Sequence, residues 1–446
     1  MKAVTSKEMI AIADLRVGMF VHLDMGWMSH PFPVGSFKIA SAEQVATIRS
    51  LGVQSVRWSP TQSDALPPLA PTGWTQPAAL DEADTPAAPT TITPADHLAV
   101  AAPAESPEAI ARNEHKRKLA DQRTALKLCE RQFAEAAQGC KLVTEMVPTK
   151  PAEARTQAEA LSKALVEKML GEHELCIRLL SDAAGDKAST HALNVTIISL
   201  LMGRTFNLSE ADMLDLGVGA MLHDIGKLDL PDRVRHRDDS FSGSEQRFYE
   251  EHVSHGVGHA RKMGLTPGAT LVIAQHHEHA DASGFPLRLN TDRMTAGARI
   301  VSLVNRYDNL CNPNLAARAL TPHESLSLLF AQGKTKFDTA ILGAFIRMMG
   351  VYPAGSTVQL TDDRYAMVVA VNSSRPLKPR VLVHEPKVPR DEALIVDLET
   401  VQGLGIRRSI KPAQLPVPSL EYLAPRPRVA YFFETLEAAD DVLATA

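Results

Sequence analysis

The spacing of apolar residues predicts a small mixed domain at the start of the chain. Within "SAEQVATIRSLGV", apolar Val45, Ile48 and Leu51 recur at helical spacing, and Ser41 stands where a helix N-cap is expected. The runs "GMFVHL" and "SVRW" on either side have the length and composition of short strands. Residues 1–65 are therefore predicted to form a small α/β domain.

A helical pattern dominates residues 171–350. In "NLSEADMLDLGVGAML", Ser209 and Asp212 have the spacing of a capping box, and apolar residues recur every three or four positions after them. His223 and Asp224 follow this stripe directly, at the end of the predicted helix.

Alternating, β-branched runs replace the helical pattern after Pro353. They read "STVQL", "YAMVVAV", "RVLVHE" and "ALIVDL", with turn clusters between them. We expect a small antiparallel β module at 351–417 and a C-terminal tail at 418–446. The predicted fold class is mainly α: an all-helical bundle with a small N-terminal α/β domain and a small C-terminal antiparallel β module.

Two segments join the N-terminal domain to the bundle. Residues 66–107 are rich in Pro, Ala and Thr, a composition that cannot bury enough apolar surface to fold, so they are predicted to be a linker. Residues 108–170 are rich in Ala, Lys, Glu and Gln and favour helices. Two interpretations stay open for these helices: a homodimer contact or a solvated connector.

Composition and charge exclude several classes of protein. The 446 residues carry 47 Lys and Arg against 52 Asp and Glu, a net charge of -5 that gives no global reason to bind a nucleic-acid polymer or a membrane surface. No apolar run approaches the roughly 18 residues of a spanning helix, and the first residues do not form a signal peptide. The four cysteines are scattered, without metal or disulfide spacing. We expect a cytoplasmic protein without a membrane span.

Histidines are concentrated where the apolar helix ends. Eight of the sixteen in the chain lie between residues 223 and 279. Imidazoles and carboxylates that converge from separate helices are how a bundle binds transition-metal ions. We expect His191 to be a first ligand and the adjacent His223 and Asp224 to serve two ions, with the carboxylate as a bridge. His252, His276 and His277 would complete the coordination sphere of the second ion.

Several short motifs follow one another in a fixed order: "HALNV" from 191, "HDIGK" from 223, "HVSHGVG" from 252, "HHE" from 276, "SGFP" from 283 and "ARIV" from 298. With these motifs the sequence resembles the HD-GYP phosphodiesterases of the HD metallohydrolase superfamily. The resemblance implies a binuclear iron or manganese centre that hydrolyses cyclic di-GMP to linear pGpG, to GMP, or to both. It also implies an uncharacterised N-terminal domain that is common in bacterial members.

The resemblance assigns roles residue by residue. The implied metal ligands are His191, His223, Asp224, His252, His276, His277 and Asn305. Asp224 and Lys227 are the implied catalytic residues, with the Lys227 ammonium on a phosphate oxygen. The implied substrate contacts are Lys227, Gly284, Phe285, Pro286 and Arg288.

Three departures from the family pattern affect these expectations. Phe285 replaces the signature tyrosine and lacks its hydroxyl. Asn305 stands where members usually have an aspartate ligand, so either Asn305 or Asp308, one turn later, completes the site. Lys187 replaces the glutamate found in members with three ions, which predicts two. A cyclic di-GMP sensor or scaffold that docks other signalling proteins, and a phosphohydrolase acting on another nucleotide, remain alternative functions.

Overall fold

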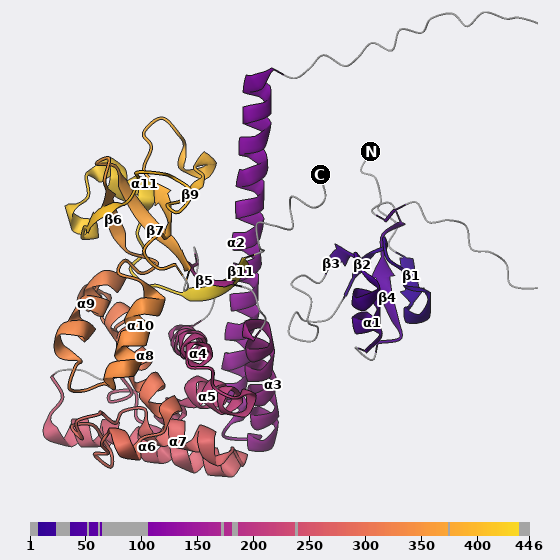
Figure 1. The fold of residues 1–446 in the computed structure, drawn as a ribbon. Coiled ribbons are helices and arrows are strands. Elements are labelled where there is room, and N and C mark those ends of the chain that lie inside the picture. Colours follow the sequence, from indigo (N-terminus) through magenta and orange to yellow (C-terminus); the bar gives the residue numbers. More distant parts are fainter. Residues whose placement is uncertain are drawn as a thin grey trace, which may run out of the picture. The chain divides into compact units, whose positions relative to one another are not determined.

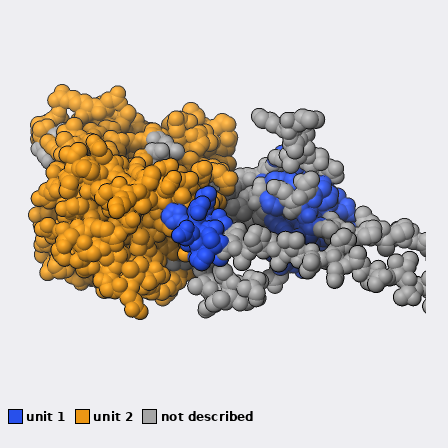
Figure 2. All heavy atoms as spheres, turned by 90° about the horizontal axis from the view of Figure 1, so that it is seen from above, with its two compact units in different colours: residues 1–26, 32–116 blue, residues 27–31, 117–446 orange. Residues whose placement is uncertain are grey.

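The chain folds into two compact units, and each has its own hydrophobic core. The computed structural model describes residues 8–23, 36–50, 53–60, 63–64, 106–170, 174–180, 186–236, 240–372 and 375–436. Unit 1 comprises residues 1–26 and 32–116, and unit 2 comprises residues 27–31 and 117–446 (Figure 2). Almost all of the predicted linker lies outside the described residues.

Unit 1 contains a four-stranded antiparallel sheet and one helix. The strands run in the order β1 (Glu8–Ala11), β4 (Ser55–Trp58), β2 (Phe20–His22) and β3 (Ser36–Lys38). Helix α1 (Ala42–Ser50) begins after Ser41, whose hydroxyl accepts a hydrogen bond from the Gln44 amide at 3.3 Å. Val45 and Ile48 of this helix are buried in the core of the unit. Both runs expected as strands are strands.

Helices α2 (Pro107–Met146) and α3 (Pro151–Met169) form the predicted helix pair. From Cys129 onward, α2 buries one face in the core of unit 2, including Phe133 and Cys140. Helix α3 packs against that core through Leu161 and Leu165. These parts of the two helices therefore belong to the core of unit 2 and are not a solvated connector.

The helical bundle of unit 2 follows these helices. Its members are α4 (Lys187–Thr205), α5 (Glu210–Leu222), α6 (Gly243–Met263), α7 (Pro267–Gln275), α8 (Ala296–Cys311), α9 (Pro322–Gln332) and α10 (Thr339–Met349). Helix α4 lies at the centre and packs against both α5 and α8. No helix in the described part of the chain is both long and apolar enough to cross a membrane.

A seven-stranded antiparallel sheet covers one end of the bundle (Figure 1). Five strands come from the expected β module: β6 (Thr357–Leu360), β7 (Tyr365–Asn372), β8 (Arg380–Val383), β9 (Ile395–Asp397) and β10 (Ile406–Ser409). The other two are β5 (Glu174–Leu179), which precedes the bundle, and β11 (Tyr431–Leu436), which is close to the end of the chain. β5 pairs with both β7 and β11.

The prediction of a tail from residue 418 is therefore wrong for the residues that the structure describes. Helix α11 (Val417–Leu423) and strand β11 fold onto unit 2. Tyr431, Phe432 and Phe433 are all buried, and Phe432 packs edge-on against Phe133 of α2 with ring centroids 6.4 Å apart. Because β11 is covered on both faces, its sequence lacks the alternation that marks a strand with one exposed face.

Candidate metal centre

Helix α5 ends where the site begins. Ser209 caps its start and accepts a hydrogen bond from the Asp212 amide at 3.2 Å, as the sequence predicts. His223 follows the last residue of the helix and is fully buried. Asp224 then starts a short 3-10 helix, η4 (Ile225–Asp229), that packs closely against α6. The side chains of His223 and Asp224 therefore meet residues from other helices.

The structure brings six of the predicted ligands together in two groups that share Asp224. One group is His191, His223 and Asp224, and the other is Asp224, His252, His276 and His277; within each group the ligand atoms lie within 4.8 Å of one another. Asp224 Oδ2 faces His191 Nε2 at 3.7 Å and His223 Nε2 at 3.4 Å. Asp224 Oδ1 faces His252 Nε2 at 3.6 Å and His276 Nε2 at 3.7 Å. One carboxylate thus presents one oxygen to each group.

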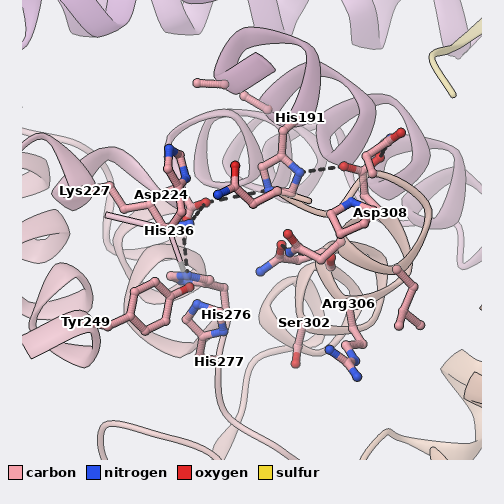
Figure 3. A pocket seen from close by; sticks show the side chains of 18 of the residues that line it. His191, Asp224, Lys227, His236, Tyr249, His276, His277, Ser302, Arg306 and Asp308 are labelled. Carbon is pink, nitrogen blue, oxygen red and sulfur yellow. Dashed lines mark hydrogen bonds and ion pairs between the residues drawn. The ribbon is translucent and has the colours of Figure 1, made fainter. Parts of the chain in front are cut away.

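Hydrogen bonds fix which ring nitrogen faces the centre. The Nδ1 atoms of His223, His252 and His276 donate to the carbonyl oxygens three residues earlier, at 2.7, 2.5 and 2.7 Å. His191 Nδ1 donates to Asp308 Oδ2 at 2.6 Å (Figure 3). With the proton on Nδ1, each Nε2 carries a lone pair and no hydrogen.

These lone pairs meet one another, which favours a cation between them. His191 Nε2 lies 3.2 Å from His223 Nε2, and His252 Nε2 lies 3.4 Å from His276 Nε2. Asp224 Oδ1 and His277 Nε2 are buried and have no hydrogen-bond partner in the described structure. Buried acceptors without donors are costly, and metal ions satisfy them. The donor set of imidazole and carboxylate fits transition-metal ions.

Burial and neighbouring charges agree with this interpretation. Burial lowers the pKa of His223, and it lowers the pKa of His252 to about 3, so both rings are neutral, as metal ligands must be. Burial alone would raise the pKa of Asp224, but the Lys227 ammonium and His223 outweigh it, and the pKa lies well below its usual value. Asp224 is therefore a carboxylate.

Lys227 lies beside the cluster, one turn after His223. Its ammonium donates to Asp224 Oδ2 at 2.6 Å and lies 5.5 Å above the ring of Tyr249. Burial would lower the pKa of Lys227, but Asp224 and Tyr249 raise it above its usual value. Lys227 is therefore a cation fixed at the edge of the two ligand groups.

Comparisons with known proteins place this cluster in a family. The HD domain family model matches residues 174–341, and the model of a domain of unknown function, DUF3391, matches residues 8–158. The Pseudomonas aeruginosa protein named cyclic di-GMP phosphodiesterase PA4108 is 25% identical over 401 residues, which are 87% of this chain and 88% of that protein. Residues 174–341, which contain all six clustered ligands, therefore match the HD domain family.

Other relatives match the chain over shorter lengths. The cyclic di-GMP phosphodiesterase response regulator RpfG of Xanthomonas campestris is 29% identical over 150 residues, 33% of this chain and 39% of its own. A 3'3'-cGAMP-specific phosphodiesterase 2 of Vibrio cholerae is 28% identical over 131 residues, 29% of this chain and 25% of its own. Among solved structures, the HDG"Y"P protein Bd1817 from Bdellovibrio bacteriovorus aligns over 76% of this chain and 98% of its own, with 12% identity and a TM-score of 0.40.

The ligand groups of the HD domain open into a cavity of about 1010 Å³. His191, Asp224, Lys227, His276, His277 and Asn305 line it. Asp308 also lines it, but its Oδ2 is bonded to the outer nitrogen of His191 and its side chain is fully buried. Of the two candidates for the last ligand position, Asp308 therefore supports His191, and Asn305 remains the residue proposed for that position.

The "SGFP" loop contributes to the cavity through Phe285. Its ring stacks on His277 with the centroids 4.5 Å apart. Buried Glu278 holds the loop by accepting hydrogen bonds from the Leu287 and Leu289 amides at 2.6 and 2.8 Å. Sequence reasoning missed this role of Glu278, although its place beside His276 and His277 was a signal.

The predicted substrate contacts of the other loop residues are not supported by this geometry. Within the described residues, the cavity lining does not include Gly284, Pro286 or Arg288. Gly284 instead packs against the backbone of the preceding segment: a Cβ there would lie 2.5 Å from Glu278 Cα and from His279 N. Arg288 is exposed and has a positive φ of 53°. Gly284 shapes the loop, and Arg288 points to solvent.

Several cations of the lining were not predicted as substrate contacts. They are Lys187, Arg306, Arg318, Lys336 and Arg428. They come from five separate parts of the chain, so no local motif joins them. Lys187 was the most accessible to sequence reasoning, because it lies one helical turn before His191 on the same face.

Proposed function

We propose that the protein is a metal-dependent phosphodiesterase that hydrolyses cyclic di-GMP to linear pGpG, to GMP, or to both, in bacterial second-messenger signalling. The observation that carries the proposal is Asp224, which lines a cavity that also contains cations and whose two oxygens face two separate histidine groups. Relatives that carry the name cyclic di-GMP phosphodiesterase support the choice of substrate.

The residues that would hold the metal are His191, His223, Asp224, His252, His276, His277 and Asn305. Iron and manganese are the proposed metals, because imidazole, carboxylate and amide oxygen suit both. A bound pair of these ions supplies Lewis acidity at the phosphorus and lowers the pKa of water at the site. The Nδ1 hydrogen bonds of the histidines hold each ring in place for this role.

The remaining residues of the site would bind and orient the substrate. The Lys227 ammonium hydrogen-bonds to Asp224, so it would contact a phosphate oxygen of a substrate bound at the metal site. There it would oppose the negative charge that develops in the transition state. Lys187 and Arg428 line the same cavity and would oppose the charge of a dianionic dinucleotide. Phe285 offers a flat apolar face beside His277, on which a base can stack.

The direct test is turnover by protein prepared without oxygen and loaded in turn with iron and manganese. We expect cyclic di-GMP to disappear and pGpG or GMP to accumulate, as resolved by chromatography. The double variant His223→Ala with Asp224→Ala should lose both metal and turnover. The proposal fails if protein with metal at full occupancy leaves cyclic di-GMP intact across the whole metal panel.

Two residues favour a second candidate, a sensor or scaffold for cyclic di-GMP. Asn305 is neutral where an acidic ligand is usual, and Phe285 lacks the hydroxyl of the family signature. Titration calorimetry separates the two functions, because a sensor binds the dinucleotide without consuming it. Including 3'3'-cGAMP and linear nucleotides in the same assay tests the third possibility, a different nucleotide substrate.

The proposed partners beyond the substrate are a second copy of the chain, through the 108–170 helices, and other signalling proteins. Ile110 and Leu142 of α2 are exposed apolar side chains that a dimer would cover. Sedimentation of the full chain would show whether it dimerises. A cytoplasmic location remains part of the proposal.

A further inference from the structure

The hydrogen bond that orients His191 is the first of a buried chain of hydrogen bonds. Asp308 Oδ2 accepts from His191 Nδ1 at 2.6 Å. Its other oxygen, Oδ1, accepts from the side-chain amides of Asn194 at 2.8 Å and Asn312 at 2.9 Å. Asp308 is fully buried, so these three donors fix the plane of its carboxylate.

Both amides continue to the segment that leads into β11. The carbonyl oxygen of Val429 accepts from Asn194 Nδ2 at 3.0 Å and from Asn312 Nδ2 at 2.9 Å. In return, the Val429 amide donates to Asn312 Oδ1 at 2.9 Å, and the Tyr431 amide donates to Asn194 Oδ1 at 3.1 Å. The backbone of the segment thus determines which way each amide points, since each oxygen must face a backbone N–H.

The segment itself is anchored in the sheet. The Ala430 carbonyl accepts from the Leu180 amide at 3.0 Å, and β11 then pairs with β5 along its length. The Tyr431 hydroxyl lies 3.1 Å from the Tyr307 hydroxyl and donates to the Ala354 carbonyl at 3.3 Å. A hydrogen-bonded part of the sheet therefore holds one end of the hydrogen-bond chain, and a proposed metal ligand is at the other end.

We infer that residues 429–431 position His191 for the metal, acting through Asn194 and Asn312 on Asp308. This inference rests on the proposed function only in that His191 binds metal. A carboxylate on the outer nitrogen of a ligating histidine fixes the ring and raises its basicity, and the loss of such a partner typically weakens metal binding by about 10- to 100-fold. Residues 429–431 would thus belong to the metal site, although they contribute only backbone atoms to this chain of hydrogen bonds.

The test is the affinity for Mn²⁺ alone, measured by titration of the metal-free protein. Asn194→Leu removes one amide at similar volume, and Asn312→Ser removes the other at a half-buried position where the fold should tolerate the change. We expect each variant to bind its weakest-held ion about 10- to 100-fold less tightly. The absorption spectrum of Co²⁺-loaded protein should also change, because it reports ligand geometry at the ion.

The matched control is Thr196→Val. It alters a buried polar residue of α4, the helix that carries Asn194, but Thr196 takes no part in the chain of hydrogen bonds to Asp308. Among the described residues, the buried Thr196 hydroxyl donates to the Ala192 carbonyl at 2.7 Å. This variant should bind Mn²⁺ as the unsubstituted protein does. If Asn194→Leu does not fold, Asn312→Ser decides the matter alone.

Wild-type Mn²⁺ affinity and an unchanged Co²⁺ spectrum in Asn312→Ser would overturn the inference. That result leaves the proposed function intact. Conversely, metal-loaded wild-type protein that does not cleave cyclic di-GMP would refute the proposed function, and the Mn²⁺ titrations would still decide the role of residues 429–431.

Discussion

Asp224 shows why two ionisable residues stand side by side where an apolar helix ends. His223 is fully buried and faces one ligand group, while the carboxylate that follows it reaches both groups with separate oxygens. Lys227 pairs with Asp224 Oδ2, but Oδ1 is buried and has no hydrogen-bond partner among the described residues. A cation bound between the ligand groups would satisfy this oxygen and would explain the adjacency.

At the residue scale, Lys227→Gln should separate chemistry from metal binding. Lys227 is not placed as a ligand, so the variant should keep its metal, while kcat falls by about 100- to 1,000-fold because a fixed donor to the transition state is lost. Metal content and steady-state kinetics measure the two effects. Lys262→Gln, at an exposed position in the last turn of α6, is the control and should change neither. An unchanged kcat in Lys227→Gln would remove Lys227 from the catalytic residues.

Gly284→Ala should distort the loop that carries Phe285. The new Cβ would lie 2.5 Å from two backbone atoms of residues 278 and 279, and backbone cannot yield as a flexible side chain can. Such overpacking typically costs about 1–3 kcal/mol. Thermal unfolding should show the loss, and KM for the dinucleotide should rise as Phe285 shifts.

Gly258→Ala is the matched control for that substitution. Gly258 lies inside α6, and no heavy atom lies within 4 Å of its added Cβ. Alanine should therefore stabilise the helix by about 0.5–1 kcal/mol. Melting temperatures that move in the same direction for both variants would contradict the argument.

At the scale of elements, the sequence predicted those whose signal is local. Helix α5 with its Ser209 cap and strands β6 to β9 follow from patterns within a few residues of each other. Strand β11 could not be predicted in this way, because it is buried on both faces and pairs with β5, about 250 residues earlier along the chain. Asn194 and Val429 are also far apart, at 235 residues, so the hydrogen bonds that support His191 could not be predicted either.

The pairing of β5 with β11 includes a buried ion pair. Replacing only one of its two charged residues should lower the stability of the fold. Arg178 Nη1 donates to Glu434 Oε2 at 2.7 Å, and the Arg178 side chain is 4% exposed while that of Glu434 is 16% exposed. Glu434→Leu should lower the free energy of unfolding by about 3–5 kcal/mol, because it leaves a buried guanidinium unpaired. Urea unfolding followed by far-ultraviolet circular dichroism would measure this.

The double variant Arg178→Met with Glu434→Leu completes that cycle. With both charges replaced by apolar side chains, no buried charge remains unpaired, so most of the lost stability should return. A double variant that is less stable than Glu434→Leu alone would contradict this argument, because it would show that the unpaired guanidinium is not the cause of the loss.

For the whole molecule, the site depends on residues from both ends of unit 2. The HD motifs lie between residues 191 and 308. The sequence alone predicted that they form one site, because their order and residue types are typical of a metal centre. The cavity lining also includes Thr144 of α2 and Arg428 of the last segment. No motif predicts these contributions, since they follow from how the sheet closes over the bundle.

Acid should destabilise the metal-free protein through the same buried histidines. In the folded chain, burial lowers the pKa of His223, and that of His252 to about 3, whereas unfolded histidines titrate near 6.5. Below about pH 6.5 the unfolded state therefore binds more protons than the folded state. The free energy of unfolding must then fall as the pH falls, by up to about 1.4 kcal/mol per pH unit for each such histidine.

Urea unfolding of metal-free protein between about pH 6.5 and 5, above the range where carboxylates titrate, isolates this effect. His252→Gln should reduce the slope of stability against pH by one histidine's share, because glutamine takes up no proton in the unfolded state. Bound metal adds to the acid sensitivity of the unsubstituted protein, since protons compete with the ions for Nε2. An equal slope in the wild-type and His252→Gln proteins would mean that His252 is protonated in the folded chain, and a protonated ring cannot bind metal.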